Sequence, residues 1–381
     1  MTTYSAVVTT GIYCRPGCAA RPLARNVRLF DHPAAAEAAG FRACQRCRPY
    51  RVAGPVGSSA PEIVCEAVQL IINGALDDGG TEAALAERIG ISARHLRRLF
   101  RTHLGASPDQ LARSRRAHFA RRLLDDTDLT ILDIAFAAGF GSLRQFNRTM
   151  REVFRASPSD LRNRRRRADR LAADGGLALR LPVESDYDWA GVRSFLAARA
   201  LPGVETVDGD TYRRVITMVG VPGLVEVSAA EQNSLLLRLH LPYWEGLIHV
   251  VERIGRLVGA DADHTAGVST PELTAPGAWN AFEAGVWAIL SGGPGLAGFV
   301  AKLGTPVAGL PAGLTHAFPD PAVVTLDTMA PIGLRPADAS AIVALAKMFA
   351  VGPHPGPGDD LWRPWLTLAT AHLNGPVSCA D

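Results

Sequence analysis

The chain has 381 residues, six cysteines and a formal net charge of +3. This length exceeds what one hydrophobic core usually holds and predicts two to four domains, and no apolar run approaches the ~20 residues that a membrane-spanning helix needs. The charge is divided unevenly: residues 1–170 contain 28 basic residues, all arginine, and 16 acidic ones, whereas residues 171–381 contain 12 basic and 21 acidic residues. The first part is therefore expected to bind a polyanion such as nucleic acid, and the second is not.

The first four cysteines form two closely spaced pairs, in "TTGIYCRPGC" and "GFRACQRCRP". Cys14 and Cys18 are separated by three residues, and Cys44 and Cys47 by two. Each pair can turn back and present two thiolates to one tetrahedral ion, which predicts a four-cysteine site for a single Zn²⁺. The alternatives are disulfides or four unrelated thiols; few cysteines and no apolar segment at the start favour zinc and a cytoplasmic location.

An internal repeat follows a Gly/Pro/Ser-rich linker at residues 52–61. Residues 85–111 and 134–161 both contain a short apolar helix, a glycine turn, a longer amphipathic helix and the sequence Ala-Ser-Pro. Gly90 and Gly139 permit the sharp turn between the two helices of each copy. The repeat predicts two helix-turn-helix units, which can bind double-stranded DNA in successive major-groove turns.

The second helix of each copy is the expected recognition helix. Ser92 and Ser142 stand where they can cap these helices. The side chains expected to contact DNA from them are Arg94, His95, Arg97, Arg98, Arg144, Gln145, Asn147 and Arg148. A helical bundle with solvated arginines is the alternative, and the basic helix at residues 112–124 between the copies argues against it. The arginine run at residues 162–170 is interpreted either as a phosphate contact or as a solvated helix end.

The pattern changes after residue 177. Partly alternating apolar segments predict an antiparallel sheet with helices on one face, and helical spacing returns after about residue 270. Dense Gly and Pro between the later helices predict weak structure there. We therefore expect a multidomain α+β protein with a small zinc-bound α/β domain, an all-α tandem helix-turn-helix domain, an antiparallel-sheet α+β domain and a truncated helical domain, at residues 1–52, 60–168, 175–262 and 270–381 respectively.

The motifs in the first part carry a family resemblance. Residues 5–50 resemble the methylphosphotriester-acceptor zinc domain of the Ada family, through "TTGIYCRPGCAAR", "NVRLF" and "AAGFRACQRCRP". Residues 60–165 are similar to the AraC-type DNA-binding domain. The resemblance implies that Cys14 accepts a methyl group from a DNA phosphotriester, and that Arg21 and Arg42 contact DNA phosphates, with Thr10 on the strand that leads to Cys14. Methylation would change the charge of a four-thiolate zinc site by about one unit and reduce its repulsion of the DNA backbone. A purely structural role for Cys14 is the alternative.

Residues 177–381 resemble the AlkA family of 3-methyladenine DNA glycosylases, through "LPVESDYDWAGVRSFLAARALPGVE", "PGAWNAFEAGVWAIL", "GLTHAFPDP" and "LWRPWLTLATAHL". That family needs a helix-hairpin-helix and an aspartate about twenty-five residues later. Here nine residues, "GPHPGPGDD", stand in that place, and Asp320, Asp327 and Asp338 are not at suitable positions. We therefore expect no glycosylase activity. Four tryptophans could line a pocket for a base or small ligand, although we favour a core role for them: Trp279, Trp287, Trp362 and Trp365.

These observations favour a DNA-alkylation-responsive transcription regulator whose glycosylase-like half is a scaffold, a non-catalytic lesion reader or a contact for RNA polymerase. The second of Ada's two acceptor motifs, Pro-Cys-His-Arg, is absent, and no O6-methylguanine repair is expected. Two alternatives remain open at this point: a 3-methyladenine glycosylase, and a ligand-sensing AraC-type regulator with a structural zinc site.

Overall fold

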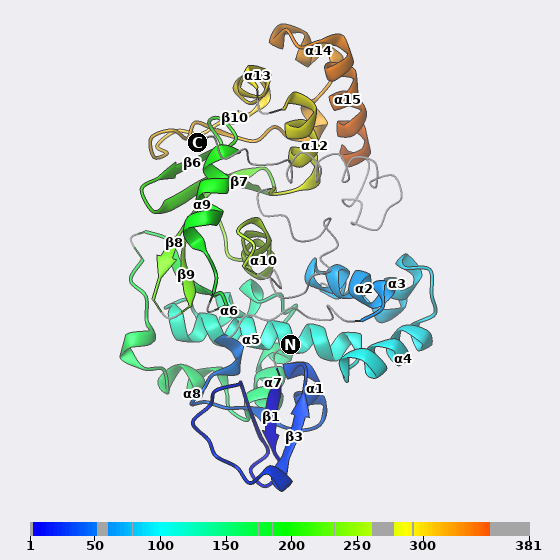
Figure 1. Cartoon of the computed structure of the whole chain (residues 1–381), viewed down its shortest axis with the longest axis vertical. Helices are drawn as coiled ribbons and strands as arrows, with labels where there is room; N and C mark the ends of the chain where they lie inside the picture. The colour runs from blue at the N-terminus through cyan, green and yellow to red at the C-terminus, as the bar shows by residue number, and fades with distance from the viewer. Residues whose placement is uncertain are drawn as a thin grey trace, which may run out of the picture. The chain divides into compact units, whose positions relative to one another are not determined.

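The computed structural model describes residues 3–51, 60–77, 79–173, 175–184, 186–231, 233–260, 278–291 and 293–350. The chain divides into two units (Figure 1). The first contains Met1–Ala172, Ala178–Glu184 and Tyr243–Glu252, and the second contains Ala173–Leu177, Ser185–Pro242 and Arg253–Asp381. Among the described helices, none is long and apolar enough to cross a membrane.

The first unit begins with a four-stranded sheet in the order β3-β1-β2-β4. Strand β2 runs antiparallel to β1 and parallel to β4, and β3 runs antiparallel to β1. Tyr4 and Ala6 alternate inward on β1, as expected of a strand with one buried face. The elements of this part are β1 (Tyr4–Val7), β2 (Ile12–Cys14), η1 (Ala24–Asn26), β3 (Val27–Phe30), α1 (Pro33–Ala38), β4 (Arg42–Ala43) and η2 (Pro49–Arg51).

The tandem helix-turn-helix prediction is confirmed. Each copy turns at its predicted glycine, since Gly90 and Gly139 have φ of +72° and +76°. The recognition helices are α4 and α7, and the Oγ atoms of Ser92 and Ser142 accept hydrogen bonds from the third residue of each helix at 3.2 Å. The helices are α2 (Glu62–Ile72), α3 (Glu82–Arg88), α4 (Ala93–Leu104), α5 (Pro108–Asp126), α6 (Ile131–Ala137), α7 (Leu143–Phe154) and α8 (Pro158–Asn163), followed by η3 (Arg167–Asp169).

On each recognition helix, apolar residues spaced four positions apart form the buried face. On α4, Leu96, Phe100 and Leu104 are at most 3 % exposed. On α7, the matching buried residues are Phe146, Met150 and Phe154. The charged residues between them remain on the opposite face, which is the face a recognition helix presents to DNA.

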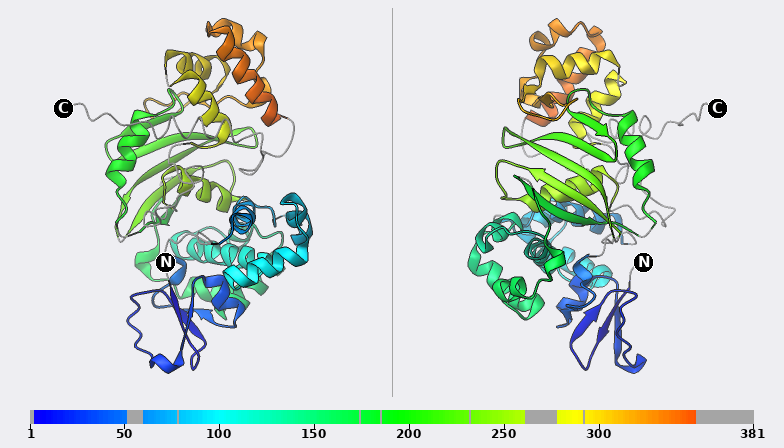
Figure 2. Two further views of the ribbon diagram at one scale, coloured as in Figure 1. Left: turned by 45° about the vertical axis from the view of Figure 1, so that its right-hand side comes forward. Right: turned by 90° about the vertical axis from the view of Figure 1, so that its left-hand side faces the viewer.

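The predicted sheet of the AlkA-like part has five strands, in the order β5-β9-β8-β7-β6, and is seen in Figure 2. Strands β6 to β9 pair in sequence order, each antiparallel to the next. Three of these strands were predicted, and β6 was missed because four residues, "ETVD", carry little alternation. The bounds are β5 (Leu177–Pro182), α9 (Trp189–Ala198), β6 (Glu205–Asp208), β7 (Thr211–Met218), β8 (Val221–Ala230), β9 (Ser234–His240) and α10 (Leu247–Leu257).

The remaining described part is helical, and one prediction about it is wrong. The Gly/Pro-rich segment after residue 290 was expected to be weakly structured, but α13 starts there with Pro294 in its first turn, where proline's missing N–H costs nothing. The segment "LWRPWLTLATAHL" at residues 361–373, with Trp362 and Trp365, lies outside the described residues. The elements are α12 (Ala281–Leu290), α13 (Pro294–Leu303), β10 (Thr305–Pro306), β11 (His316–Ala317), η4 (Pro321–Val323), α14 (Leu326–Met329), η5 (Ala330–Ile332) and α15 (Pro336–Ala350).

Candidate metal centre and nucleic-acid interface

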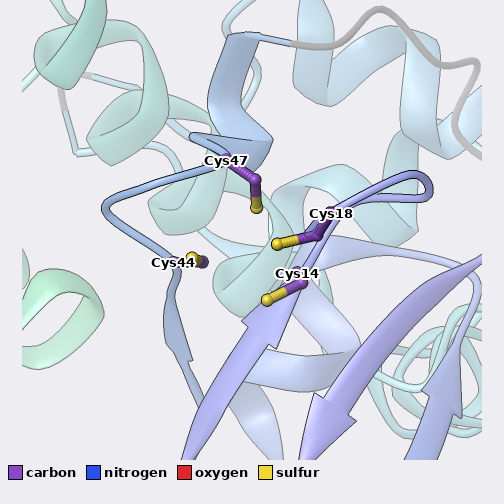
Figure 3. A group of neighbouring side chains, drawn as sticks. All are labelled: Cys14, Cys18, Cys44 and Cys47. Carbon is purple, nitrogen blue, oxygen red and sulfur yellow. The ribbon is translucent and has the colours of Figure 1, made fainter. Parts of the chain in front are cut away.

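Parallel pairing of two strands brings the two cysteine pairs together. In the β2–β4 register Tyr13 faces Ala43, so Cys14 and Cys44 leave the same end of the sheet. The Cys44 N–H donates to the Tyr13 carbonyl at 3.0 Å. The Sγ atoms of Cys14, Cys18, Cys44 and Cys47 all lie within 4.8 Å of one another and point toward a common centre (Figure 3).

The donor set fits a zinc ion. A tetrahedral site with Zn–S bonds of about 2.3 Å separates its sulfur atoms by about 3.8 Å. That separation is compatible with four sulfurs that all lie within 4.8 Å of one another. A divalent ion in this position would stabilise all four sulfurs as thiolates.

The proposed methyl acceptor is the least exposed of the four ligands. Cys14 is 6 % exposed, whereas Cys18, Cys44 and Cys47 are half-buried. Two exposed arginines lie within the cysteine pairs, and sequence reasoning did not select them: Arg15 follows Cys14, and Arg46 precedes Cys47. Their position between ligand residues was the available signal. Both side chains are free to meet an anion next to the cluster.

The three predicted DNA contacts in the zinc domain are in different settings. Thr10 lies in the exposed turn before β2, not on the strand as expected, because Gly11 turns the chain at φ +64°. Arg21 is exposed in the loop after Cys18. Arg42 is half-buried on β4, with a guanidinium nitrogen 3.4 Å from the Ala43 carbonyl oxygen.

On the first recognition helix, some residues predicted to contact DNA contact other side chains of the protein instead. Arg94 is exposed on α4. Arg97 forms an ion pair with Glu82 of α3, and a guanidinium nitrogen of Arg98 lies 3.2 Å from Nδ1 of His95. This arrangement leaves Arg94 as the arginine of the set that is most available to a partner.

The second recognition helix is more open. Arg144 and Arg148 are exposed, and Gln145 and Asn147 are half-buried beside them. The Asn147 amide donates to the Leu143 carbonyl at 2.9 Å, and Arg148 lies 3.8 Å from Glu152. These side chains line a hollow of about 640 Å³ together with Ser142, Arg151, Glu152 and Arg155. The four residues predicted on α7 are thus brought together on one polar face.

Two arginines of the basic helix between the two copies are buried in internal ion pairs. On α5, Arg116 and Arg121 are both 5 % exposed. Arg116 pairs with Asp77 at 2.7 Å, and Arg121 pairs with Asp125 at 2.8 Å. Arginine in this segment therefore serves internal ion pairs, which a count of basic residues cannot distinguish from phosphate contacts.

The arginine run at residues 162–170 also makes internal contacts. Arg165 and Arg170 both pair with Asp128, at 2.7 Å and 2.6 Å. Burial and the neighbouring Arg165 charge lower the pKa of Arg162. Arg164, Arg166 and Arg167 are exposed in this run and form no ion pair among the described residues.

A buried charge cluster in the second unit has a structural explanation. Arg214 is 1 % exposed and forms ion pairs with Glu205 of β6 and Glu283 of α12. Burial lowers the pKa of Arg214, but the two carboxylates outweigh it and raise it overall. The Trp279 ring lies 5.4 Å from the Arg214 guanidinium carbon. Trp279 is 7 % exposed and Trp287 packs against the helical core, as the favoured interpretation expected.

The three aspartates that we set aside as glycosylase acids have local roles or none. Asp320 caps η4 by accepting from the Ala322 N–H at 2.8 Å, and Asp338 pairs with Arg335 at 2.8 Å. Asp327 lies in the exposed first turn of α14.

Three family models match successive parts of the chain. Residues 2–50 match the family model of the metal binding domain of Ada, residues 85–164 match a helix-turn-helix domain, and residues 178–270 match the AlkA N-terminal domain. The chain is 41% identical over 278 residues to the probable bifunctional transcriptional activator/DNA repair enzyme AlkA of Mycobacterium tuberculosis, which covers 71% of this chain and 56% of that protein.

Two further relatives match the first part. The bifunctional transcriptional activator/DNA repair enzyme Ada of Escherichia coli is 32% identical over 149 residues, covering 38% of this chain and 41% of that protein. The bifunctional transcriptional activator/DNA repair enzyme AdaA of Bacillus subtilis is 31% identical over 144 residues, covering 38% of this chain and 66% of that protein. The chain thus spans little more than half the length of the mycobacterial relative.

The fold and the cysteine cluster define a four-cysteine metal binding domain joined to tandem helix-turn-helix units. More particularly, the chain combines an Ada-type metal binding domain, an AraC-type tandem helix-turn-helix domain and an AlkA-like region, and its four clustered cysteines hold one zinc ion.

Proposed function

We propose that this protein is a DNA-alkylation-responsive transcription regulator. The observation that carries the proposal is the convergence of Cys14, Cys18, Cys44 and Cys47 in a domain that matches the metal binding domain of Ada, followed directly by two helix-turn-helix units. Cys14 accepts a methyl group from a methylphosphotriester in DNA, and the helix-turn-helix domain binds promoter DNA. RNA polymerase is the further partner that a transcription activator needs.

The proposed methyl transfer is stoichiometric, with Cys14 as the acceptor. When bound, zinc keeps the four cysteine sulfurs as thiolates at neutral pH. The Cys14 sulfur attacks the methyl carbon, an S–CH3 bond forms from the sulfur electron pair, and the O–CH3 bond breaks with its pair left on the phosphate oxygen. The products are S-methylcysteine and an ordinary phosphodiester anion, and no proton moves. Because Cys14 is not regenerated, each protein molecule accepts one methyl group.

The exposed arginines around the site support binding of the damaged backbone. Arg15, Arg21 and Arg46 are exposed near the ligand cysteines. An arginine fork donates two hydrogen bonds to the phosphate on either side of the lesion. Because Cys14 is nearly buried, we expect the duplex to be held at the edge of the cluster before the methyl group reaches the sulfur.

Specific DNA recognition is assigned to the polar faces of the recognition helices. Thr10, Arg21 and Arg42 are assigned to the damaged backbone. The residues proposed to contact promoter DNA are Arg94, His95, Arg97, Arg98, Arg144, Gln145, Asn147 and Arg148. Phosphate contacts by arginine supply affinity, and base-edge contacts supply specificity.

We also propose that the AlkA-like region is not a glycosylase. The residues that stand in place of the hairpin, "GPHPGPGDD", lie outside the described part of the chain. Inside the described part, Asp320 and Asp338 make local contacts, and Asp327 is exposed. The domain boundaries at residues 1–52, 60–168, 175–262 and 270–381 belong to the same proposal.

Intact mass and zinc content before and after incubation with methylated DNA test the acceptor function, followed by peptide mapping. We expect a gain of one methyl group, on Cys14, with zinc retained. Cys18→Ser is the informative comparison, because it removes a ligand and leaves the acceptor in place. Absence of transfer to a folded, zinc-bound protein would refute the acceptor role and leave a structural zinc site. Release of 3-methyladenine from the same DNA would refute the proposal that the AlkA-like region is not a glycosylase.

A further inference from the structure

A buried tyrosine next to Cys14 contacts the helix that joins the two helix-turn-helix units. Tyr13 is 0 % exposed. Its hydroxyl donates to Oε1 of Glu37 on α1 at 2.6 Å and lies 3.1 Å from Nε2 of His118 on α5. The same Glu37 oxygen lies 2.7 Å from His118 Nε2, which closes a three-membered polar cluster. The strand that ends at Cys14 is thus tied to α5 by one side chain.

The second cysteine pair is tied to α5 in the same way. Arg48 follows Cys47 directly, is 9 % exposed, and pairs with Asp169 at 2.8 Å and with Asp125 of α5 at 3.6 Å. Tyr50 donates to Asp125 at 2.9 Å. One residue next to a ligand of each pair therefore reaches the same helix.

These contacts fall on one face of α5 and continue into the second recognition helix. His118 and Asp125 are seven residues apart, which places them two turns apart on the same side. The His118 ring lies 5.8 Å from the ring of Phe154, and the Tyr50 ring lies 5.9 Å from it. Phe154 is the last residue of α7 and is 3 % exposed. A packed series of side chains therefore runs from the acceptor strand to the helix that presents Arg144 to DNA.

We propose that Tyr13, Glu37 and His118 couple methylation of Cys14 to DNA binding by the helix-turn-helix domain. The proposal rests on the acceptor function proposed above. Methylation would then act on DNA binding in two ways, through the change in charge and through the packed side chains that link β2 to α5. Conversion of the thiolate to a thioether changes the end of β2, and Tyr13 transmits that change to α5 and Phe154. Tyr13 and His118 are positioning residues, because neither touches the methyl group.

The test compares DNA affinity before and after methylation in the full-length chain. The probe is a duplex of about 30 base pairs, selected from random sequences by the methylated wild-type protein. Tyr13→Phe removes one oxygen and keeps the buried ring. Tyr4→Phe is the matched control, since Tyr4 packs edge-on against Tyr13 from β1 at 6.1 Å and lies outside the cluster. Methyl transfer and zinc content are measured for each variant.

For the wild type we expect methylation to raise affinity by about 5- to 150-fold. Tyr13→Phe should lower this ratio by about 2- to 30-fold while methyl transfer and zinc content stay at wild-type levels. His118→Ala should do the same, and the double variant should lose no more than either alone. Tyr4→Phe should keep the wild-type ratio.

Three results would count against the proposal, and they are distinguishable. If Tyr13→Phe and His118→Ala accept the methyl group and keep the wild-type ratio, the charge change alone raises affinity and the coupling is refuted. If the wild-type protein accepts no methyl group, the acceptor function fails and the coupling fails with it. Loss of zinc from Tyr13→Phe would also count against it, because the residue would then maintain the metal site; His118→Ala, which is remote from the cysteines, repeats the measurement.

Discussion

Asp77 shows how single side chains hold distant segments of the first unit together. One oxygen lies 2.7 Å from Arg116 of α5, and the other lies 2.7 Å from Nε2 of His249. Burial raises the pKa of Asp77, but the hydrogen bond with His249 and the charge of Arg116 outweigh burial and lower it. A lowered pKa stabilises the folded state above the ordinary value near 4, and the stabilisation is lost as pH falls through the lowered pKa.

Asp77→Asn should reduce the free energy of unfolding at pH 7 by about 3 kcal/mol, because it leaves Arg116 buried without its carboxylate. The deficit relative to the wild type should shrink as pH falls from 5 toward 3. Urea denaturation followed by circular dichroism at several pH values measures both. Asp109→Asn is the control, since the Asp109 side chain is more than half exposed in its pair with the half-buried Arg113 and the pair should contribute less than about 1 kcal/mol. Equal deficits in the two variants at pH 7 would contradict this role of Asp77.

At the scale of elements, the two recognition helices share a cap and a turn but differ in the availability of their arginines. On α4, Arg97 is paired with Glu82. On α7, Arg144 is exposed and has no ion pair among the described residues. Arg144→Ala should therefore lower affinity for a selected duplex by about 5- to 150-fold, the range of a base contact, and Arg97→Ala by less than about 5-fold. Titration of labelled duplex at fixed salt measures both, and a larger loss in Arg97→Ala would reverse the ranking.

The elements also show what sequence can and cannot predict here. Caps and turns depend on neighbouring residues, so Ser92, Ser142 and the glycine turns were predictable from spacing. The cysteine cluster was predictable because only short paired spacings bring four thiols to one ion. The burial of Arg116 was not, since its carboxylate partner, Asp77, lies 39 positions away and only the fold brings them together. Strand β6 and helix α13 were missed for the same reason: packing stabilises them against weak local signals.

At the scale of the whole molecule, the first unit does not end where the helix-turn-helix repeat ends. Ala178–Glu184 and Tyr243–Glu252 belong to it, although both fall in the AlkA-like region. Arg180 pairs with Asp126 at 3.0 Å, Glu252 pairs with Arg115 at 2.7 Å, and the Gly246 N–H donates to the Phe136 carbonyl at 3.2 Å. Segments of the AlkA-like region thus complete the contacts of α5 and α6.

Truncation after Arg170 should therefore separate stability from DNA affinity. It removes Arg180, His249 and Glu252, three partners worth about 1 kcal/mol each, and should lower the melting temperature of the zinc and helix-turn-helix unit by about 6–12 °C. Nonspecific affinity at low temperature, and its decline with salt, should persist, because every arginine proposed to contact phosphate precedes residue 171. Zinc release on heating reports the first unit in both proteins. The double variant His249→Ala, Arg180→Ala in the full chain should lower the melting temperature by much of the amount that truncation does. An unchanged zinc-release temperature in the truncated protein would contradict the prediction, because it would show that the first 170 residues are stable without these contacts.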